Sequence, residues 1–427
     1  MTSKFKKRLG RLSGAPGKKV ERSTQEAGSD VPLEATKPVS DMKPDTGSRP
    51  SFSRVKRKKL TNVSNPFRSN SKSTAPKPAK PLPGIEESIG GYAYRVCRQH
   101  VESKHCHGNT SLEGAIELPL DIYSLMLLEY QEDVPPIDRW LFMDTETTGL
   151  AGGTGTLPFV IGIAQWDSGR WRTEQFVLEG PGKERGMLKA FHERLNASDV
   201  LVTYNGKSYD FPLIRARCVM NRLPEPKVST HIDLLHIFRR LYGRELDDVR
   251  LTTIESERLG FHREDDLPGS EVPEVYFRFL RTGRPERFDG VLKHNHDDLL
   301  AMVGMIAHLR TTLSQPEESL SAWAEFSLAK MRVRLNDEGA AVDRLRSVLA
   351  RGAVGQDNWF ESLVMAGALL KRRGAFNEAV RLLEEARSLA GYLNEAALES
   401  LAKLYEHQIR DLEKARRCAR ELVSEFG

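Results

Sequence analysis

Two acidic residues, Asp144 and Glu146, stand one residue apart at the end of the apolar stretch 140–143. Residues i and i+2 of a β-strand project to the same face. Two carboxylates on one face of a buried strand repel each other and lose hydration, and a bound cation offsets both effects. A solvated turn at the end of a strand is the alternative, so the pair gains weight only from two further acidic motifs.

The second acidic motif surrounds Asp210. An apolar strand is expected to end at Tyr204, and a polar loop containing Gly206 then leads to Asp210 at the start of a helix. Asp210 would serve there as a simple helix cap. Packing of Phe211 into the sheet would instead turn Asp210 toward the carboxyl edge of the strand, where mixed sheets usually place ligands.

The third motif pairs His294 with Asp298, one helical turn apart. Helical spacing puts both on a stripe with apolar side chains, namely Val291, Met302, Met305 and Leu309. Asp297 falls on a neighbouring stripe, so we assign the functional role to Asp298. The alternatives are a buried salt bridge for Asp298 and a satisfied core histidine for His294.

Four carboxylates from one strand and two helices suit two divalent cations, and oxygen-only ligands favour Mg²⁺ or Mn²⁺. Two such ions activate a water and stabilise the leaving oxygen of a phosphodiester. The predicted metal ligands are Asp144, Glu146, Asp210 and Asp298. His294 is placed to orient or deprotonate the water and completes the predicted catalytic set. The predicted substrate-binding residues are Thr147, Tyr204, Asn205 and Lys207; Lys207 either contacts a phosphate or is simply solvated.

An α/β domain over residues 90–312 is expected to position these side chains. Strands are predicted at 141–144, 159–166, 171–178 and 200–204. Helices are predicted at 184–195, 212–221, 232–242, 274–280 and 288–312. Three antiparallel strands followed by alternating helix and strand predict a mixed sheet flanked by helices.

The N-terminal segment, residues 1–85, has a different composition. Residues 1–80 hold 20 Lys and Arg against 6 Asp and Glu, a net charge of +14; because the whole chain is +5, the remainder is −9. This Ser-, Pro- and Lys-rich segment lacks the apolar surface to offset its ordering entropy, so we predict a disordered basic arm. Its cluster at 54–59 would neutralise phosphates, or is a solvated tail.

The C-terminal segment, residues 318–427, is predicted to be entirely helical. Ala341, Ala379 and Ala415 lie in similar contexts, 38 and 36 residues apart. This spacing resembles tetratricopeptide repeats, in which small residues allow paired helices to pack closely. Such repeats would bind a protein partner, and a plain helical bundle is the alternative.

Taken together, the motifs resemble the DEDD exonuclease superfamily of ribonuclease-H-like domains and, within it, the YprB-type proteins. The resemblance rests on DTETTGL (144–150), GGTGT (152–156), YNGKSYD (204–210), HIDL (231–234), PGSEVP (268–273), His294-Asn295 and Asp298. It implies a 3′-to-5′ exonuclease-type fold with two metal ions held by the four acids. Such exonucleases usually have a Tyr with three residues between it and the last Asp, or a His with four. Here His294 stands at the spacing of the Tyr.

We therefore expect a two-metal-ion nuclease, most simply a 3′-to-5′ exonuclease acting on single-stranded 3′ ends of DNA or RNA. An endonuclease acting on RNA–DNA hybrids would use the same ions. The alternative of another class is a non-catalytic nucleic-acid-binding adaptor whose helical repeats recruit a partner. The chain has no apolar run of bilayer length and no secretory signal, and its four cysteines are scattered. These features predict a cytoplasmic protein without membrane contact.

Overall fold

The computed structural model describes residues 82–149, 155–314, 320–352, 358–389 and 395–426. The predicted basic arm and its cluster at 54–59 lie outside these residues. So does most of the glycine-rich loop at 152–156.

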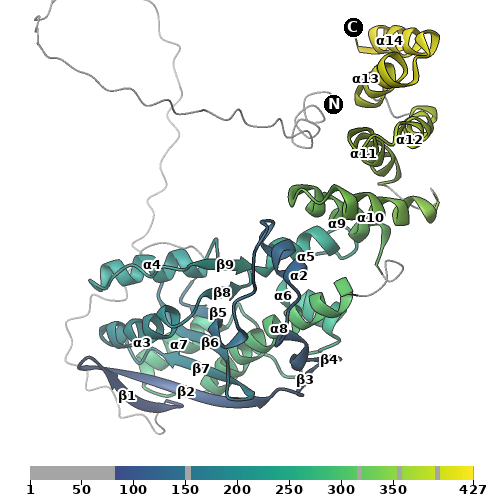
Figure 1. Cartoon of the computed structure of the whole chain (residues 1–427). Coiled ribbons are helices and arrows are strands. Elements are labelled where there is room, and N and C mark those ends of the chain that lie inside the picture. The colour runs from purple at the N-terminus through teal and green to yellow at the C-terminus, as the bar shows by residue number, and fades with distance from the viewer. Residues whose placement is uncertain (1–81, 150–154, 315–319, 353–357, 390–394, 427) are drawn as a thin grey trace, which may run out of the picture. The chain divides into compact units, whose positions relative to one another are not determined.

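A seven-stranded mixed sheet forms the centre of the first part of the chain (Figure 1). Its order is β1-β2-β7-β6-β5-β8-β9. The first five strands in this order pair antiparallel, whereas β5, β8 and β9 pair parallel. The strands are β1 (Ile85–Ile89), β2 (Tyr92–Glu102), β5 (Trp140–Thr147), β6 (Pro158–Asp167), β7 (Arg170–Val177), β8 (Val200–Thr203) and β9 (Thr230–Asp233). A separate hairpin joins β3 (Cys106–His107) to β4 (Thr110–Ser111).

Helices cover both faces of this sheet. They are α2 (Leu120–Leu127), α3 (Glu184–Asn196), α4 (Asp210–Met220), α5 (Leu234–Tyr242), α6 (Leu251–Ile254), α7 (Val272–Thr282) and α8 (Phe288–Ser314). Trp140 and Phe142 of β5 belong to a core shared with α2, α5 and α8. Leu141 and Met143 belong to a second core shared with α3, α4 and α7. This alternation puts the next residues of the same parity, Asp144 and Glu146, on the α8 side of the sheet.

The predicted mixed sheet flanked by helices is confirmed, with differences at its edges. The prediction missed β1, β2 and β9. The helix predicted at 232–242 begins only at Leu234, because residues 230–233 pair in parallel with β8. Asp233 then ends the strand and caps the helix by accepting a hydrogen bond from the Leu235 N–H at 3.2 Å.

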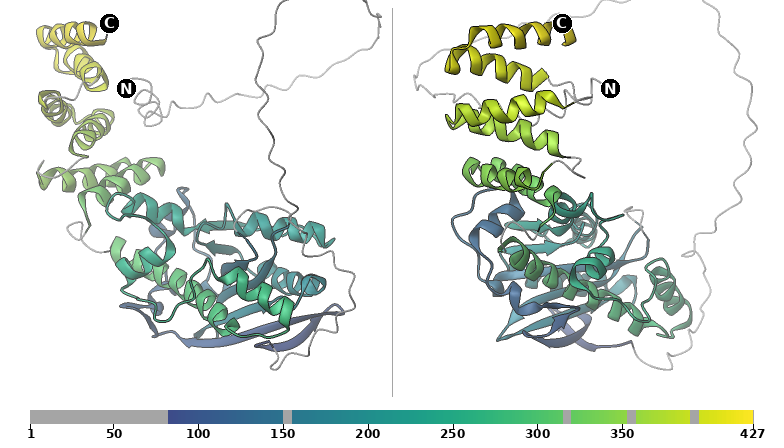
Figure 2. Two further views of the ribbon diagram at one scale, coloured as in Figure 1. Left: turned by 180° about the vertical axis from the view of Figure 1, so that it is seen from behind. Right: turned by 90° about the vertical axis from the view of Figure 1, so that its right-hand side faces the viewer.

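The C-terminal region is all-helical, as predicted (Figure 2). Its helices are α9 (Ala322–Arg334), α10 (Glu338–Ala350), α11 (Trp359–Arg372), α12 (Phe376–Ser388), α13 (Glu395–Leu404) and α14 (Leu412–Phe426). They pack as the pairs α9–α10, α11–α12 and α13–α14. Ala341 and Ala379 are fully buried in the shared core. A Cβ added at Gly367 would come within 2.6 Å of Leu383, so close packing of α11 on α12 requires glycine there.

None of the described helices, around the sheet or in this region, combines the length and the apolarity that a membrane span requires.

Candidate metal centre

The end of β5, the start of α4 and the first half of α8 bring the predicted site residues together. Among the described residues, Glu146, His294 and Asp298 offer ligand atoms that all lie within 4.8 Å of one another. Asp144 lies on the same strand face as Glu146, and Asp210 is bonded to Thr145 between them. Four acids and a histidine from three separate segments of the chain are therefore close enough to affect one another's pKa.

Glu146 is the most deeply buried of the four acids, at 8% exposure. Its Oε1 is buried and has no hydrogen-bond partner among the described residues. Burial, reinforced by the charges of Asp298 and Asp210, raises the pKa of Glu146 to about 8 in spite of the nearby His294. A buried carboxylate oxygen without a donor is energetically costly, and a cation is the usual remedy.

Asp144 is held by an amide. The Nδ2 of Asn295 on α8 donates to Asp144 Oδ2 at 2.8 Å. Burial, with the charges of Asp298, Glu146 and Asp210, raises the pKa of Asp144 well above its usual range, and the Asn295 hydrogen bond opposes this shift only in part. Burial and neighbouring negative charges therefore disfavour the ionised form of Asp144, as they do for Glu146.

Asp210 faces β5. The α4 helix begins at Asp210 itself, and the capping position belongs to Tyr209, which makes no side-chain cap hydrogen bond. The Asp210 carboxylate instead accepts a hydrogen bond from the Thr145 hydroxyl. Burial raises the pKa of Asp210 to about 6, and the Thr145 hydrogen bond counteracts part of that rise. The reading of Asp210 as a helix cap alone is therefore wrong.

The loop that leads to Asp210 is fixed by Asp233. The Asp233 carboxylate accepts from the backbone N–H groups of Asn205 at 2.7 Å and Lys207 at 3.1 Å. It also caps α5, so one side chain both holds this loop and begins the helix. Asn205 has a φ of +64°, a left-handed conformation that these hydrogen bonds help to maintain.

Asp298 has a cationic partner. It forms an ion pair with Arg263, whose side chain is 6% exposed and also contacts the buried Glu255 at 2.6 Å. Glu255 in turn contacts His107 at 2.7 Å. The salt-bridge alternative for Asp298 is thus present, yet its pKa remains raised, because burial outweighs Arg263 and His294.

His294 lies between two carboxylates. Its Nδ1 is 2.8 Å from Asp266 Oδ1, and its Nε2 is 3.7 Å from Asp298 Oδ2. A carboxylate accepts hydrogen bonds, so the short Asp266 contact favours a proton on Nδ1, although Arg263 Nη1 also lies 3.3 Å from the same nitrogen. Burial lowers the pKa of His294, but Asp298, Glu146 and Asp266 together raise it above its ordinary value. Nε2 is left facing the acids.

The predicted substrate-binding residues have different surroundings. Thr147 donates through its hydroxyl to Gly149 O at 3.1 Å. The Tyr204 hydroxyl donates to Val249 O at 2.5 Å and so is used within the fold. The Lys207 side chain is exposed, in the loop just before Asp210.

Several site residues were not predicted from the sequence. Asp297, which the sequence analysis placed on a neighbouring stripe, pairs with Lys293 at 3.0 Å. Sequence reasoning missed a second group: Thr145, Gln175, Glu255, Arg263, Asp266 and Asn295. Thr145 and Asn295 lie within motifs that carry the resemblance, DTETTGL (144–150) and His294-Asn295, but no role was assigned to either. The other four carried no signal in the sequence.

Residues 141–310 match the RNase_H superfamily, and the chain belongs to that superfamily. The fold described above is thus an RNase H-like nuclease fold, as predicted. The chain is also similar to the uncharacterized protein YprB of Bacillus subtilis strain 168. The two are 34% identical over 291 residues, which make up 66% of this chain and 69% of the relative.

Proposed function

We propose that this chain is a metal-dependent nuclease of the DEDD type that removes nucleotides from the 3′ end of DNA or RNA. The observation that carries the proposal is the buried Glu146 oxygen without a partner, beside Asp144 and Asp298. Three carboxylates whose pKa values are raised by burial and mutual repulsion form a site that a divalent cation would stabilise.

The residues fit two Mg²⁺ or Mn²⁺ ions. The donor set consists of four carboxylates, which suits hard divalent cations. Asp144, Glu146, Asp210 and Asp298 would hold the ions. Bound there, such ions supply an activated water and stabilise the charge on the leaving oxygen of a phosphodiester.

The protein's own groups would orient the reaction. His294 would accept the proton of the attacking water at Nε2, since Asp266 keeps the proton of the ring on Nδ1. Arg263 would hold the Asp298 carboxylate in place from its buried position. Both functions depend on side chains that the fold already fixes.

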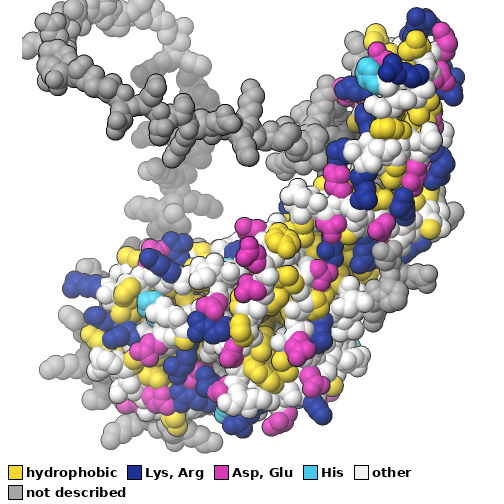
Figure 3. Space-filling view, in the orientation of Figure 1, with side chains coloured by type: hydrophobic (Ala, Val, Ile, Leu, Met, Phe, Trp, Pro, Cys, Tyr) yellow, Lys and Arg dark blue, Asp and Glu magenta, His cyan; other side chains and the backbone are white. Residues whose placement is uncertain are grey.

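The surroundings of the site suit a substrate that approaches from the loop before α4. Thr147, Asn205 and Lys207 would contact the nucleic acid there, with the exposed Lys207 meeting a phosphate. Tyr204, whose hydroxyl already donates to Val249 O, would contribute only its ring. Positive and negative side chains are interspersed on the face seen in Figure 3. We therefore assign non-specific attraction of the substrate to the basic N-terminal segment.

The test is Mn²⁺-dependent release of label from single-stranded DNA and RNA labelled at the 3′ end. We expect release by the wild type, and a loss of roughly 10³-fold in Asp144→Ala, because several kcal/mol of metal-derived stabilisation disappears. Asp297→Asn is the matched control: it is also an α8 carboxylate but pairs with Lys293, so activity should remain.

The same assay separates the alternatives. Cleavage of internally labelled strands with blocked 3′ ends would indicate an endonuclease instead. An absence of cleavage in both the wild type and Asp144→Ala, with nucleic acid still bound, would support a non-catalytic adaptor.

We further propose a division into a nuclease domain at 90–312 and tetratricopeptide-like repeats at 318–427 that bind a protein partner. Three helical pairs with buried alanines at matching positions support this reading. Leu412 and Val423 of α14 are 56% and 69% exposed, which gives the last helix apolar groups for such a contact. Removal of α13 and α14 should abolish partner binding and leave cleavage intact.

A further inference from the structure

Asp144 belongs to a row of residues that crosses three neighbouring strands. In the strand register, Asp144 of β5 lies opposite Gly162 of β6, and Gly162 lies opposite Gln175 of β7. Neighbouring strands are roughly 4.8 Å apart, so Asp144 and Gln175 are separated by roughly 10 Å. The side chain of Asn295 fills this gap from α8.

Glycine at the centre of the row makes room for Asn295. A Cβ at Gly162 would lie 2.0 Å from Asn295 Oδ1. Asn295 is fully buried. Its Nδ2 donates to Asp144 Oδ2 at 2.8 Å, and its Oδ1 accepts from Gln175 Nε2 at 2.9 Å. Hydrogen bonds therefore hold both the nitrogen and the oxygen of the Asn295 amide.

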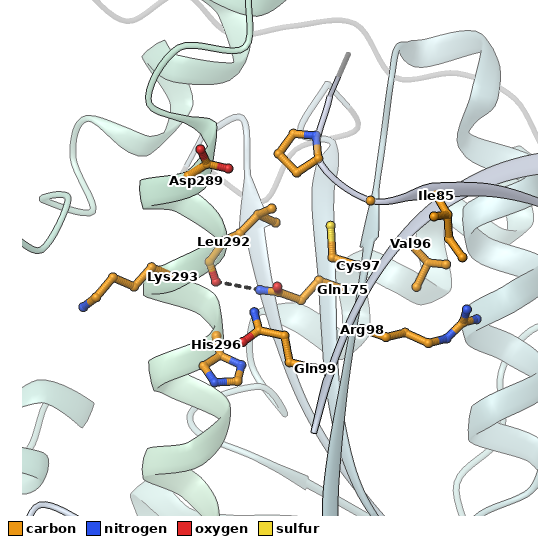
Figure 4. A pocket seen from close by; sticks show the side chains of 12 residues that line it. Ile85, Val96, Cys97, Arg98, Gln99, Gln175, Asp289, Leu292, Lys293 and His296 are labelled. Atoms are coloured by element: carbon orange, nitrogen blue, oxygen red, sulfur yellow. Dashed lines mark hydrogen bonds between the residues drawn. The ribbon is translucent and has the colours of Figure 1, made fainter. Parts of the chain in front are cut away.

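This series of hydrogen bonds ends in two acceptors, the Asp144 carboxylate and the Leu292 carbonyl, and they fix the orientation of both amides. An ionised Asp144 only accepts, so Asn295 must present Nδ2 to it and Oδ1 to Gln175. Gln175 must then present Nε2, and the same nitrogen also donates to the carbonyl of Leu292 at 2.7 Å (Figure 4). Gln175 Oε1 is left buried without a partner among the described residues, which is energetically unfavourable.

The donors in this row are neutral. An arginine at the position of Asn295 would hold Asp144 equally well, but it would also neutralise the carboxylate and repel a metal ion. A neutral amide fixes Oδ2 and leaves the negative charge and Oδ1 for a cation. On the side away from Asp144, Gln175 lines a cavity of about 640 Å³ next to Cys97 (Figure 4). Gln175 does not itself contact the acid cluster.

We propose that Asn295 and Gln175 are positioning residues for the metal ligand Asp144, and that Gln175 acts only through Asn295. This inference rests on the proposed function, because it takes Asp144 as a metal ligand. Partners of ligating groups typically change metal affinity by about 10–100-fold when they are removed. A residue one step further away should have a smaller effect.

The experiment is a calorimetric titration of the full chain with Mn²⁺ for the wild type, Asn295→Leu, Gln175→Met and the double variant. We expect affinity about tenfold weaker in Asn295→Leu and about threefold weaker in Gln175→Met. The double variant should bind Mn²⁺ no more weakly than Asn295→Leu alone, since Gln175 is proposed to affect Asp144 only through Asn295.

Gln165→Met is the matched control. Gln165 is also a buried sheet glutamine, but its Nε2 donates to Ser198 at 3.1 Å, away from the acids. The Gln165→Met substitution should lower thermal stability about as much as Gln175→Met and leave Mn²⁺ affinity unchanged.

The outcomes distinguish the two proposals. Absence of Mn²⁺ binding by the wild type, or equal binding by Asp144→Ala, would overturn the proposed function. Normal wild-type binding with unchanged affinity in Gln175→Met, or a full additional loss in the double variant, would overturn only the positioning role.

Discussion

Two buried glutamates on the same sheet have opposite surroundings. Glu174 of β7 is 1% exposed and forms ion pairs with Arg98 and Arg194, each at 2.7 Å. Burial raises the pKa of Glu174, but these arginines outweigh it and the net pKa is lowered. Glu146 of β5 is 8% exposed, forms no ion pair with an arginine of the described residues, and has a pKa raised to about 8.

Other buried glutamates of this fold resemble Glu174, because each is paired with an arginine. Glu184 is paired with Arg217, and Glu255 with Arg263, both at short range. Each of these acids is neutralised by a permanent cation of the protein. Glu146 and Asp144 lack such a partner among the described residues, which supports the proposal that their site holds an exchangeable cation.

The largest effect that would test this contrast is expected for Glu146→Gln. Cleavage should fall by roughly 10³-fold, because the amide is a poor ligand for a divalent cation. The metal-free unfolding free energy, measured by urea denaturation, should not decrease, since glutamine is buried without ionisation. A marked loss of metal-free stability would mean that Glu146 is a structural acid.

Glu174→Gln should behave in the opposite way. The unfolding free energy should fall by about 3 kcal/mol, because Arg98 and Arg194 lose a charged partner at a buried position. Cleavage per folded molecule should stay within about twofold of the wild type. If Mn²⁺ affinity also dropped, the two acidic regions would be coupled and the comparison would fail.

The pH dependence of stability sharpens the same comparison. In chelator-treated protein, the raised pKa of Glu146 means that the folded state binds more protons than the unfolded state between about 4.5 and 8. The unfolding free energy should therefore fall as pH rises through this window, by at most about 1.4 kcal/mol per pH unit for one proton. Stability from Glu174, whose pKa is lowered, should be lost only in acid.

Two measurements check this assignment. Glu146→Gln should flatten the decline in the metal-free protein, and an unchanged slope would contradict it. Saturating Mn²⁺ should reverse the slope in the wild type, because deprotonated ligands bind the ion more tightly as pH rises.

The sequence predicted the parts of the fold that depend on local pattern. The apolar run at 140–143 predicted a strand, and the spacing of Asp144 and Glu146 put both acids on one face of it. Helical spacing favoured Asp298 over Asp297 as the inward-facing acid. The strand β2, which lies between β1 and β7, was not predicted because its polar positions hide the alternation. The strand β9 escaped because it runs directly into α5.

The supporting residues of the site could not be predicted in this way. Arg263 and Asp266 lie in a loop, and their partners Asp298 and His294 are about 30 residues away in the chain. Gln175 meets Asn295 only because strand register and α8 bring them together, 120 residues apart. Local propensity carries no information on such contacts.

The smallest effect is expected for Asp266→Asn, which changes how His294 is held without touching the acids. The amide can offer either an oxygen or a nitrogen to Nδ1, so the ring loses its fixed tautomer. The rate of cleavage at saturating substrate should fall about tenfold, with KM nearly unchanged, because the proton acceptor is affected rather than substrate binding. Asp265→Asn, an exposed neighbour on the same loop, is the control and should retain full activity. If both variants were fully active, His294 would not depend on Asp266, and its Nε2 would serve the acids by another arrangement.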